Sequence, residues 1–63
     1  MKLRELRDKY NLTQKELAEK MGIVVVNISR WENYQSVPYK KNIRKLQELF
    51  GSDNISHLHF KKI

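Results

Sequence analysis

The sequence predicts an all-α fold of four or five short helices, and three observations support this prediction. Apolar side chains recur every three or four residues along most of the chain, which is the period of an amphipathic helix. The β-branched run at residues 23–26 has no second strand-like segment with which it can pair. The length of 63 residues gives room for one hydrophobic core. Residues 1–63 are therefore interpreted as a single compact domain.

The first two helices are indicated by their apolar stripes and by the residues between them. The first stripe consists of Leu3, Leu6 and Tyr10. Asn11 is expected to end this helix, because asparagine tolerates the left-handed conformation. Thr13 stands at an N-cap position, and Glu16 three residues later completes a capping box. The buried stripe of the second helix is predicted to be Leu17, Ala18 and Met21.

The third helix is predicted over about residues 24–33, after a turn at Gly22. Ile28 and Trp31 are its expected buried residues. Val24 occupies the N-cap position, where it offers no capping side chain, and we expect it to be the most buried of the neighbouring valines. Helical packing has to override the strand propensity here, because an isolated strand leaves its backbone groups without partners.

The fourth helix follows a loop at residues 34–38, and Gly51 is expected to end it. Its apolar stripe consists of Ile43, Leu46, Leu49 and Phe50. A last short helix is predicted to start at Asp53 or Asn54, with Ile55 and Leu58 facing inward. The apolar residues of the segment 55–60 exceed what we expect so small a core to cover. This segment and the end of the fourth helix are therefore expected to form a dimer surface.

The composition excludes several classes of function. The chain has no cysteine, so disulfides, thiolate metal sites and thiol nucleophiles are absent. Its N-terminus lacks the apolar run of a signal peptide, and its longest apolar run is too short to span a bilayer, so we expect a soluble, cytoplasmic protein. His57 and His59 have no third ligand nearby, and no catalytic residue set is recognisable. We therefore expect no enzymatic activity, metal, cofactor or small-molecule site.

The charge and the spacing around Gly22 point to a nucleic acid partner. The formal net charge of +6 favours a polyanion. Two short amphipathic helices joined at a glycine, over about residues 13–33, can cross steeply and leave one face of the second helix free. Such a face fits the major groove of double-stranded DNA.

The segment from Leu3 to Phe50 resembles the Cro/C1-type helix-turn-helix of lambda-repressor-like DNA-binding domains, the XRE family. The matching residues are Leu6-Arg7, Leu12-Thr13-Gln14, Glu16-Leu17-Ala18, Met21-Gly22-Ile23, Ile28-Ser29-Arg30, Trp31-Glu32-Asn33 and Pro38. The resemblance implies a bacterial or phage transcriptional regulator, expected to be a repressor, that binds two-fold symmetric operator DNA as a homodimer. It also implies that Arg7 and Glu32 form a buried salt bridge; the alternative is two surface charges.

Four residues of the third helix are the candidates for contacting DNA bases. Arg30 presents a fork that matches the O6 and N7 atoms of guanine, although a phosphate contact or a surface salt bridge would also use its charge. Val25, Val26 and Asn27 stand where the family usually has polar residues. The valine methyl groups can pack on thymine methyl groups, but they can also belong to the core or face a protein. Asn27 can reach an adenine or a phosphate.

The candidates for contacting phosphates lie at helix N-termini and in the loop after the third helix: Thr13, Gln14, Asn33, Tyr34, Ser36, Lys40, Lys41 and Arg44. The N-terminus of the second helix attracts anions through its dipole, and Gln14 matches a phosphate-contacting glutamine of the family. The basic residues at the start of the fourth helix, with Lys45 beside them, oppose the helix dipole, so phosphate contact explains their placement better than stability does. Tyr34 replaces a common glycine, so either Asn33 or Tyr34 has to adopt the left-handed conformation.

A protein-interaction module of the same fold, such as an antitoxin or anti-repressor, is the alternative function. The apolar residues Val24, Val25 and Val26 motivate it, because an exposed apolar patch is typical of a protein contact.

Overall fold

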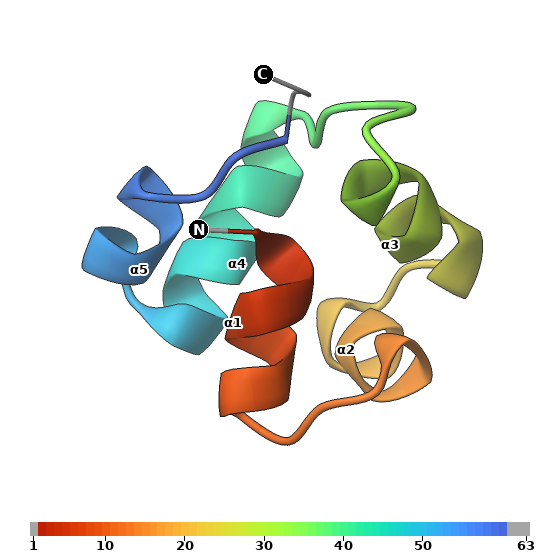
Figure 1. Cartoon of the computed structure of the whole chain (residues 1–63), viewed down its shortest axis with the longest axis horizontal. Helices are drawn as coiled ribbons and strands as arrows, with labels where there is room; N and C mark the ends of the chain where they lie inside the picture. The colour runs from red at the N-terminus through yellow and green to blue at the C-terminus, as the bar shows by residue number, and fades with distance from the viewer. Residues whose placement is uncertain (1, 61–63) are drawn as a thin grey trace.

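The computed structural model describes residues 2–60, and these residues form five helices. The helices are α1 (Leu3–Lys9), α2 (Gln14–Met21), α3 (Val25–Glu32), α4 (Lys40–Phe50) and α5 (Ser52–Ser56). In Figure 1, α2 and α3 lie side by side on one flank of α1, and α5 lies on the other flank. Within residues 2–60 the only pairing of extended segments is a single bridge between Lys2 and His59. The prediction of an all-α fold is confirmed.

The connection between α1 and α2 has the predicted local structure. Asn11 is left-handed, with a φ of 56°. The Thr13 hydroxyl accepts a hydrogen bond from the Glu16 backbone N–H at 3.0 Å, and the Glu16 carboxylate accepts one from the Thr13 backbone N–H at 2.9 Å. These hydrogen bonds from Thr13 lower the pKa of Glu16 below its ordinary value. Both members of the capping box therefore satisfy backbone groups that the helix itself leaves free.

The core collects one stripe from each helix. Its buried apolar residues are Leu3, Leu6, Leu17, Ala18, Met21, Ile28, Trp31, Leu46, Phe50 and Ile55. Ile43, Leu49, Leu58 and Phe60 are partly buried and pack against this cluster. Ile55 is buried in this cluster and Leu58 and Phe60 are partly buried, and the dimer surface expected at the end of α4 and residues 55–60 stays a prediction.

The start of α3 differs from the prediction in one respect. The helix begins at Val25 and ends at Glu32, one residue inside each predicted boundary, and Val24 is an N-cap without a side-chain hydrogen bond. We expected Val24 to be partly buried, but 63% of it is exposed, more than of Val25 or Val26. The physical reason is that Ile23, and not Val24, packs against the core.

The C-terminal part of the chain matches the predicted elements with a small shift. Gly51, with a φ of 90°, ends α4. The last helix starts directly after it, at Ser52, and ends before Leu58. No helix within residues 2–60 has the length and apolar character needed to cross a membrane.

Candidate nucleic-acid interface

Helices α2 and α3 form a compact pair around a tight turn. Gly22 adopts a left-handed conformation with a φ of 68°, and the Ile23 backbone N–H donates to the Ala18 carbonyl at 3.0 Å. Ile28 and Trp31 then bury one side of α3 in the core. The opposite side of α3 is consequently on the surface of the molecule. Helix α2 packs against α3 and supports it.

The outward side of α3 carries a mixed apolar and basic stripe. Val26 and Arg30 are four residues apart, so they lie on the same strip of the helix surface, one turn from each other. Val25 lies beside this strip, as the five-residue separation from Arg30 predicts. Val25 and Val26 are 44% and 45% exposed, and Arg30 is exposed. Ser29, which the sequence analysis did not select, is half-buried on the same side.

The N-terminus of α3 is electrostatically suited to an anionic partner. No acidic residue stands in its first turn, and no side chain caps it. Its free backbone N–H groups and the positive end of the helix dipole are therefore not neutralised by the protein itself. Arg30 in the last turn adds a full positive charge.

A cavity of about 220 Å³ lies between α3, the following loop and the start of α4. Asn27 and Arg30 line it from α3, and Tyr39 and Asn42 line it from the other side. Asn42 is buried, and its Oδ1 atom has no hydrogen-bond partner in the part of the chain that the structure describes. Asn42 and the 83% exposed Tyr39 were not among the residues predicted from the sequence. The sequence did offer one indication of Asn42, because this polar residue directly precedes Ile43, the first residue of the apolar stripe of α4.

The expected ion pair between Arg7 and Glu32 is present and has two hydrogen bonds. Arg7 Nε donates to Glu32 Oε2 at 2.6 Å, and Arg7 Nη2 donates to Glu32 Oε1 at 3.0 Å. Arg7 Nη1 also donates to the Leu12 carbonyl at 2.8 Å. The hydrogen bond with Glu32 raises the pKa of the Arg7 guanidinium above its usual value. The pair fixes α1, the loop after it and the end of α3 to one another.

Gln14, a candidate for phosphate contact, is held by this network. Its side-chain N–H donates to Glu32 Oε1 at 3.0 Å, and the residue is half-buried. Thr13, the other candidate at this helix start, uses its hydroxyl in the capping box and is exposed. Both residues therefore lie at the N-terminus of α2 with defined side-chain positions.

The turn after α3 settles which residue is left-handed. Asn33 has a φ of −94°, and its side-chain N–H donates to the Ser29 carbonyl at 2.9 Å. Tyr34 is left-handed, with a φ of 60°, and the Gln35 backbone N–H behind it donates to the Arg30 carbonyl at 2.9 Å. Ser36 is exposed further along the loop.

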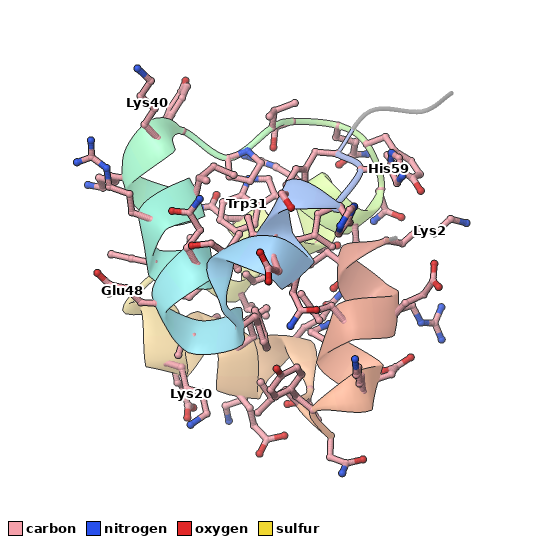
Figure 2. All side chains as sticks on the ribbon, turned by 90° about the vertical axis from the view of Figure 1, so that its left-hand side faces the viewer. Lys2, Lys20, Trp31, Lys40, Glu48 and His59 are labelled. Atoms are coloured by element: carbon pink, nitrogen blue, oxygen red, sulfur yellow. The ribbon has the colours of Figure 1, made fainter. Side chains whose placement is uncertain are left out.

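The basic residues at the start of α4 divide into two groups. Lys40, Lys41 and Arg44 are exposed, and Figure 2 shows Lys40 projecting from the end of the helix. Lys45 does not belong with them, because its ammonium donates to the Met21 carbonyl at 2.9 Å. Lys45 therefore caps the C-terminus of α2. No acidic residue balances the three exposed cations within the first turn of α4.

A comparison with known protein families shows to which family this chain belongs. A family model described as helix-turn-helix matches residues 3–53, which include α1 to α4 and the start of α5. No curated protein and no solved structure matches the chain significantly. The matched family is one of regulatory DNA-binding domains rather than of enzymes. The chain therefore belongs to the Cro/C1-type (XRE) helix-turn-helix family, whose domains bind double-stranded DNA as transcription regulators.

Proposed function

We propose that this protein is a sequence-specific transcription regulator, most simply a repressor, that reads the major groove with α3. One observation carries the proposal: Val26 and Arg30 lie one turn apart on the exposed side of α3, whose first turn contains no acidic residue. A helix with these properties can enter the major groove without placing a negative charge near the phosphates.

The residues proposed to contact bases are Val25, Val26, Asn27 and Arg30. Arg30 is the strongest of these for hydrogen bonding, because its exposed guanidinium can donate two parallel bonds to guanine. Asn27 is half-buried and lines the cavity beside α4, and either an adenine or a phosphate is within the scope of this proposal for its amide group.

The residues proposed to contact phosphates are Thr13, Gln14, Asn33, Tyr34, Ser36, Lys40, Lys41 and Arg44. The three cations in the first half of α4 carry most of the electrostatic attraction in this proposal, since all are exposed and the first turn of the helix contains no acidic residue. Gln14 has one side-chain N–H bound to Glu32, which leaves its second N–H for a phosphate.

The proposal includes a homodimer on a two-fold symmetric operator, as is usual for this family. Half-sites read by two copies of α3 are then expected about 10 base pairs apart on one face of the duplex. Such a regulator acts in the cytoplasm of a bacterial or phage-infected cell, where the DNA is.

The experiment that tests the proposal is a selection of bound sequences from random duplexes at two salt concentrations. Enrichment of a two-fold symmetric sequence supports a dimeric, specific regulator. Salt-sensitive binding without an enriched sequence contradicts specific recognition, because phosphate contacts alone carry no sequence information. Absence of binding at low salt contradicts the DNA-binding function of this chain as a whole.

A protein-interaction module is the second candidate, and the exposure of Val24, Val25 and Val26 favours it. Serine at these three positions would then abolish binding of a protein partner and leave nonspecific DNA binding intact. A regulator that reads DNA would instead lose sequence preference in the same variant.

A further inference from the structure

We propose that α3 selects target sequences by the methyl group at C5 of a pyrimidine, and that it accepts both thymine and 5-methylcytosine at that position. This inference rests on the proposed function, because it concerns the ligand of the same surface. It names the chemical group that the first half of α3 recognises, and it makes cytosine methylation a means of regulating binding.

The first observation is the chemistry of the N-terminal end of α3. Val24, Val25 and Val26 are consecutive, and all three are exposed. They occupy the N-cap and the first two positions of the helix, which are the positions that point furthest into a groove when a helix enters by its N-terminus. Their side chains have neither a hydrogen-bond donor nor an acceptor. These three side chains can therefore distinguish base pairs only by shape and by apolar contact.

The second observation identifies DNA as the occupant of this apolar surface. Val26 is continuous with Arg30, which lies one turn further along the same strip. Lys40, Lys41 and Arg44 are exposed in the first half of α4, the helix whose residue Asn42 lines the cavity beside α3. Exposed valines that lie beside an arginine, at a helix N-terminus without a side-chain cap, complement an anionic partner that also presents an apolar group.

The base edges in the major groove expose few apolar groups. All the base atoms exposed there are hydrogen-bond donors or acceptors, except the thymine methyl group and the ring C–H edges. Valine packed against a donor or acceptor removes water from it without replacing the lost hydrogen bond, which is unfavourable. Valine packed against the thymine methyl buries apolar surface on both sides, which is favourable. The surface consequently prefers a base that carries this group.

The consequence for cytosine follows from the same geometry. 5-Methylcytosine carries its methyl group at the same ring position as thymine. The two bases differ at position 4, where thymine has a carbonyl oxygen and cytosine an amino group, and valine can bond to neither. A cytosine that faces Val25 or Val26 is therefore expected to become a better target when it is methylated.

The test uses the sequence obtained by selection and changes one methyl group at a time. Each thymine is replaced singly by uracil, which removes the methyl group and keeps the base pairing. At the most sensitive position, a cytosine–guanine pair is then compared with its 5-methylcytosine counterpart. We expect removal of the critical methyl group to weaken binding about fourfold, and methylation of cytosine to tighten it by about the same factor, as burial of one methyl group predicts.

The protein variants assign the effect to named side chains. Val25→Ala and Val26→Ala are expected to reduce the ratio between thymine and uracil affinities towards one at the position that each valine contacts. Val37→Ala is the matched control, because Val37 is 45% exposed but lies outside α3. It should leave the ratio unchanged. All three side chains are exposed, so thermal unfolding of the variants should match that of the parent protein.

The outcomes separate the inference from the function on which it rests. Specific binding that tolerates uracil at every position overturns the inference and leaves the proposed function standing. A methyl effect that persists in both α3 variants overturns the assignment to these valines. If selection enriches no sequence while the valines are needed to bind a protein, the proposed function fails first, and the inference fails with it.

Discussion

The Arg7 guanidinium and the Glu32 carboxylate form two parallel hydrogen bonds that join α1 to the last turn of α3. The Nε–Oε2 and Nη2–Oε1 distances are 2.6 and 3.0 Å, and both side chains are less than one tenth exposed. Glu32 also accepts from Gln14 at the start of α2. One carboxylate therefore sets the position of α3 relative to two other helices.

Arg7→Met is expected to lower the free energy of unfolding by about 3–5 kcal/mol, because it leaves a buried carboxylate without its counter-ion. The double variant Arg7→Met with Glu32→Met should recover most of this loss, since it removes both charges. Arg4→Met is the control: Arg4 is exposed and its nearest approach to Asp8 is 4.0 Å, so its effect should be close to zero. Denaturant unfolding measures all three, and equal losses for Arg4 and Arg7 would contradict the buried role.

Gly22→Ala is expected to cost about 1 kcal/mol of folding stability. A Cβ atom at this position meets no atom within 4 Å, so the cost comes from the φ of 68° and not from a steric clash. Gly22→Asn should cost less, because asparagine tolerates the left-handed conformation. Thermal unfolding measures the stability loss of each variant. A larger loss for asparagine than for alanine would show that side-chain packing, and not backbone conformation, determines the cost at this turn.

Arg30→Ala is expected to reduce discrimination at one base pair by about 1–3 kcal/mol, the contribution of a bidentate contact to guanine. Arg4→Ala removes the same charge from α1 and should leave base preference unchanged. Binding to duplexes with all four base pairs at the affected position measures the effect. A uniform loss over the four duplexes would mean that Arg30 contacts a phosphate.

Lys41→Gln is expected to reduce the slope of log K against log salt concentration by about 0.9, the value for one phosphate contact on duplex DNA. The same change is expected for Lys40→Gln and Arg44→Gln. Lys20→Gln is the control, because Lys20 is exposed in the last turn of α2, at the opposite end of that helix from the proposed phosphate contacts Thr13 and Gln14. An unchanged slope in all three α4 variants would remove this helix from the interface.

Glu16→Gln is expected to make stability less dependent on pH in the acid range. Hydrogen bonds from Thr13 lower the pKa of Glu16 in the folded state, so its stabilising effect is fully present above the unfolded-state pKa, near 4.5. The effect is lost as the pH falls through the lower folded-state pKa. Unfolding curves at pH 7 and pH 3 should therefore differ less for the variant than for the parent. An unchanged difference would show that the capping box does not contribute to this dependence.

Local features of the fold were predictable from residue spacing, and the long-range contacts were not, except for the Arg7–Glu32 ion pair, which the family resemblance implied. The left-handed Asn11 and the Thr13 capping box depend on neighbouring residues only, so spacing was enough to predict them. The exposure of Val24 was not predicted, because packing against other helices decides that Ile23, and not Val24, reaches the core. The Lys45 ammonium looked like a fourth surface cation because its partner, the Met21 carbonyl, is 24 residues away.

For the candidate site too, the sequence predicted which side of α3 is exposed but not the contacts between different helices. Spacing predicted that Ile28 and Trp31 face inward, and therefore which side of α3 is exposed. It did not reveal that Gln14 bonds to Glu32, or that Asn42 lines a cavity with Asn27 and Arg30, since these contacts join different helices. The individual base and phosphate contacts remain predictions that the binding experiments test.

The bond from Lys45 to the Met21 carbonyl has a consequence for the kinetics of association. It ties α4 to the end of α2, so the exposed cations of α4 and the exposed side of α3 are held in one rigid arrangement before any ligand arrives. Little chain entropy then has to be lost on binding, because within residues 2–60 the helices that carry this surface are already formed. Encounter with DNA should therefore proceed in a single bimolecular step, at a rate governed by diffusion, orientation and ionic strength.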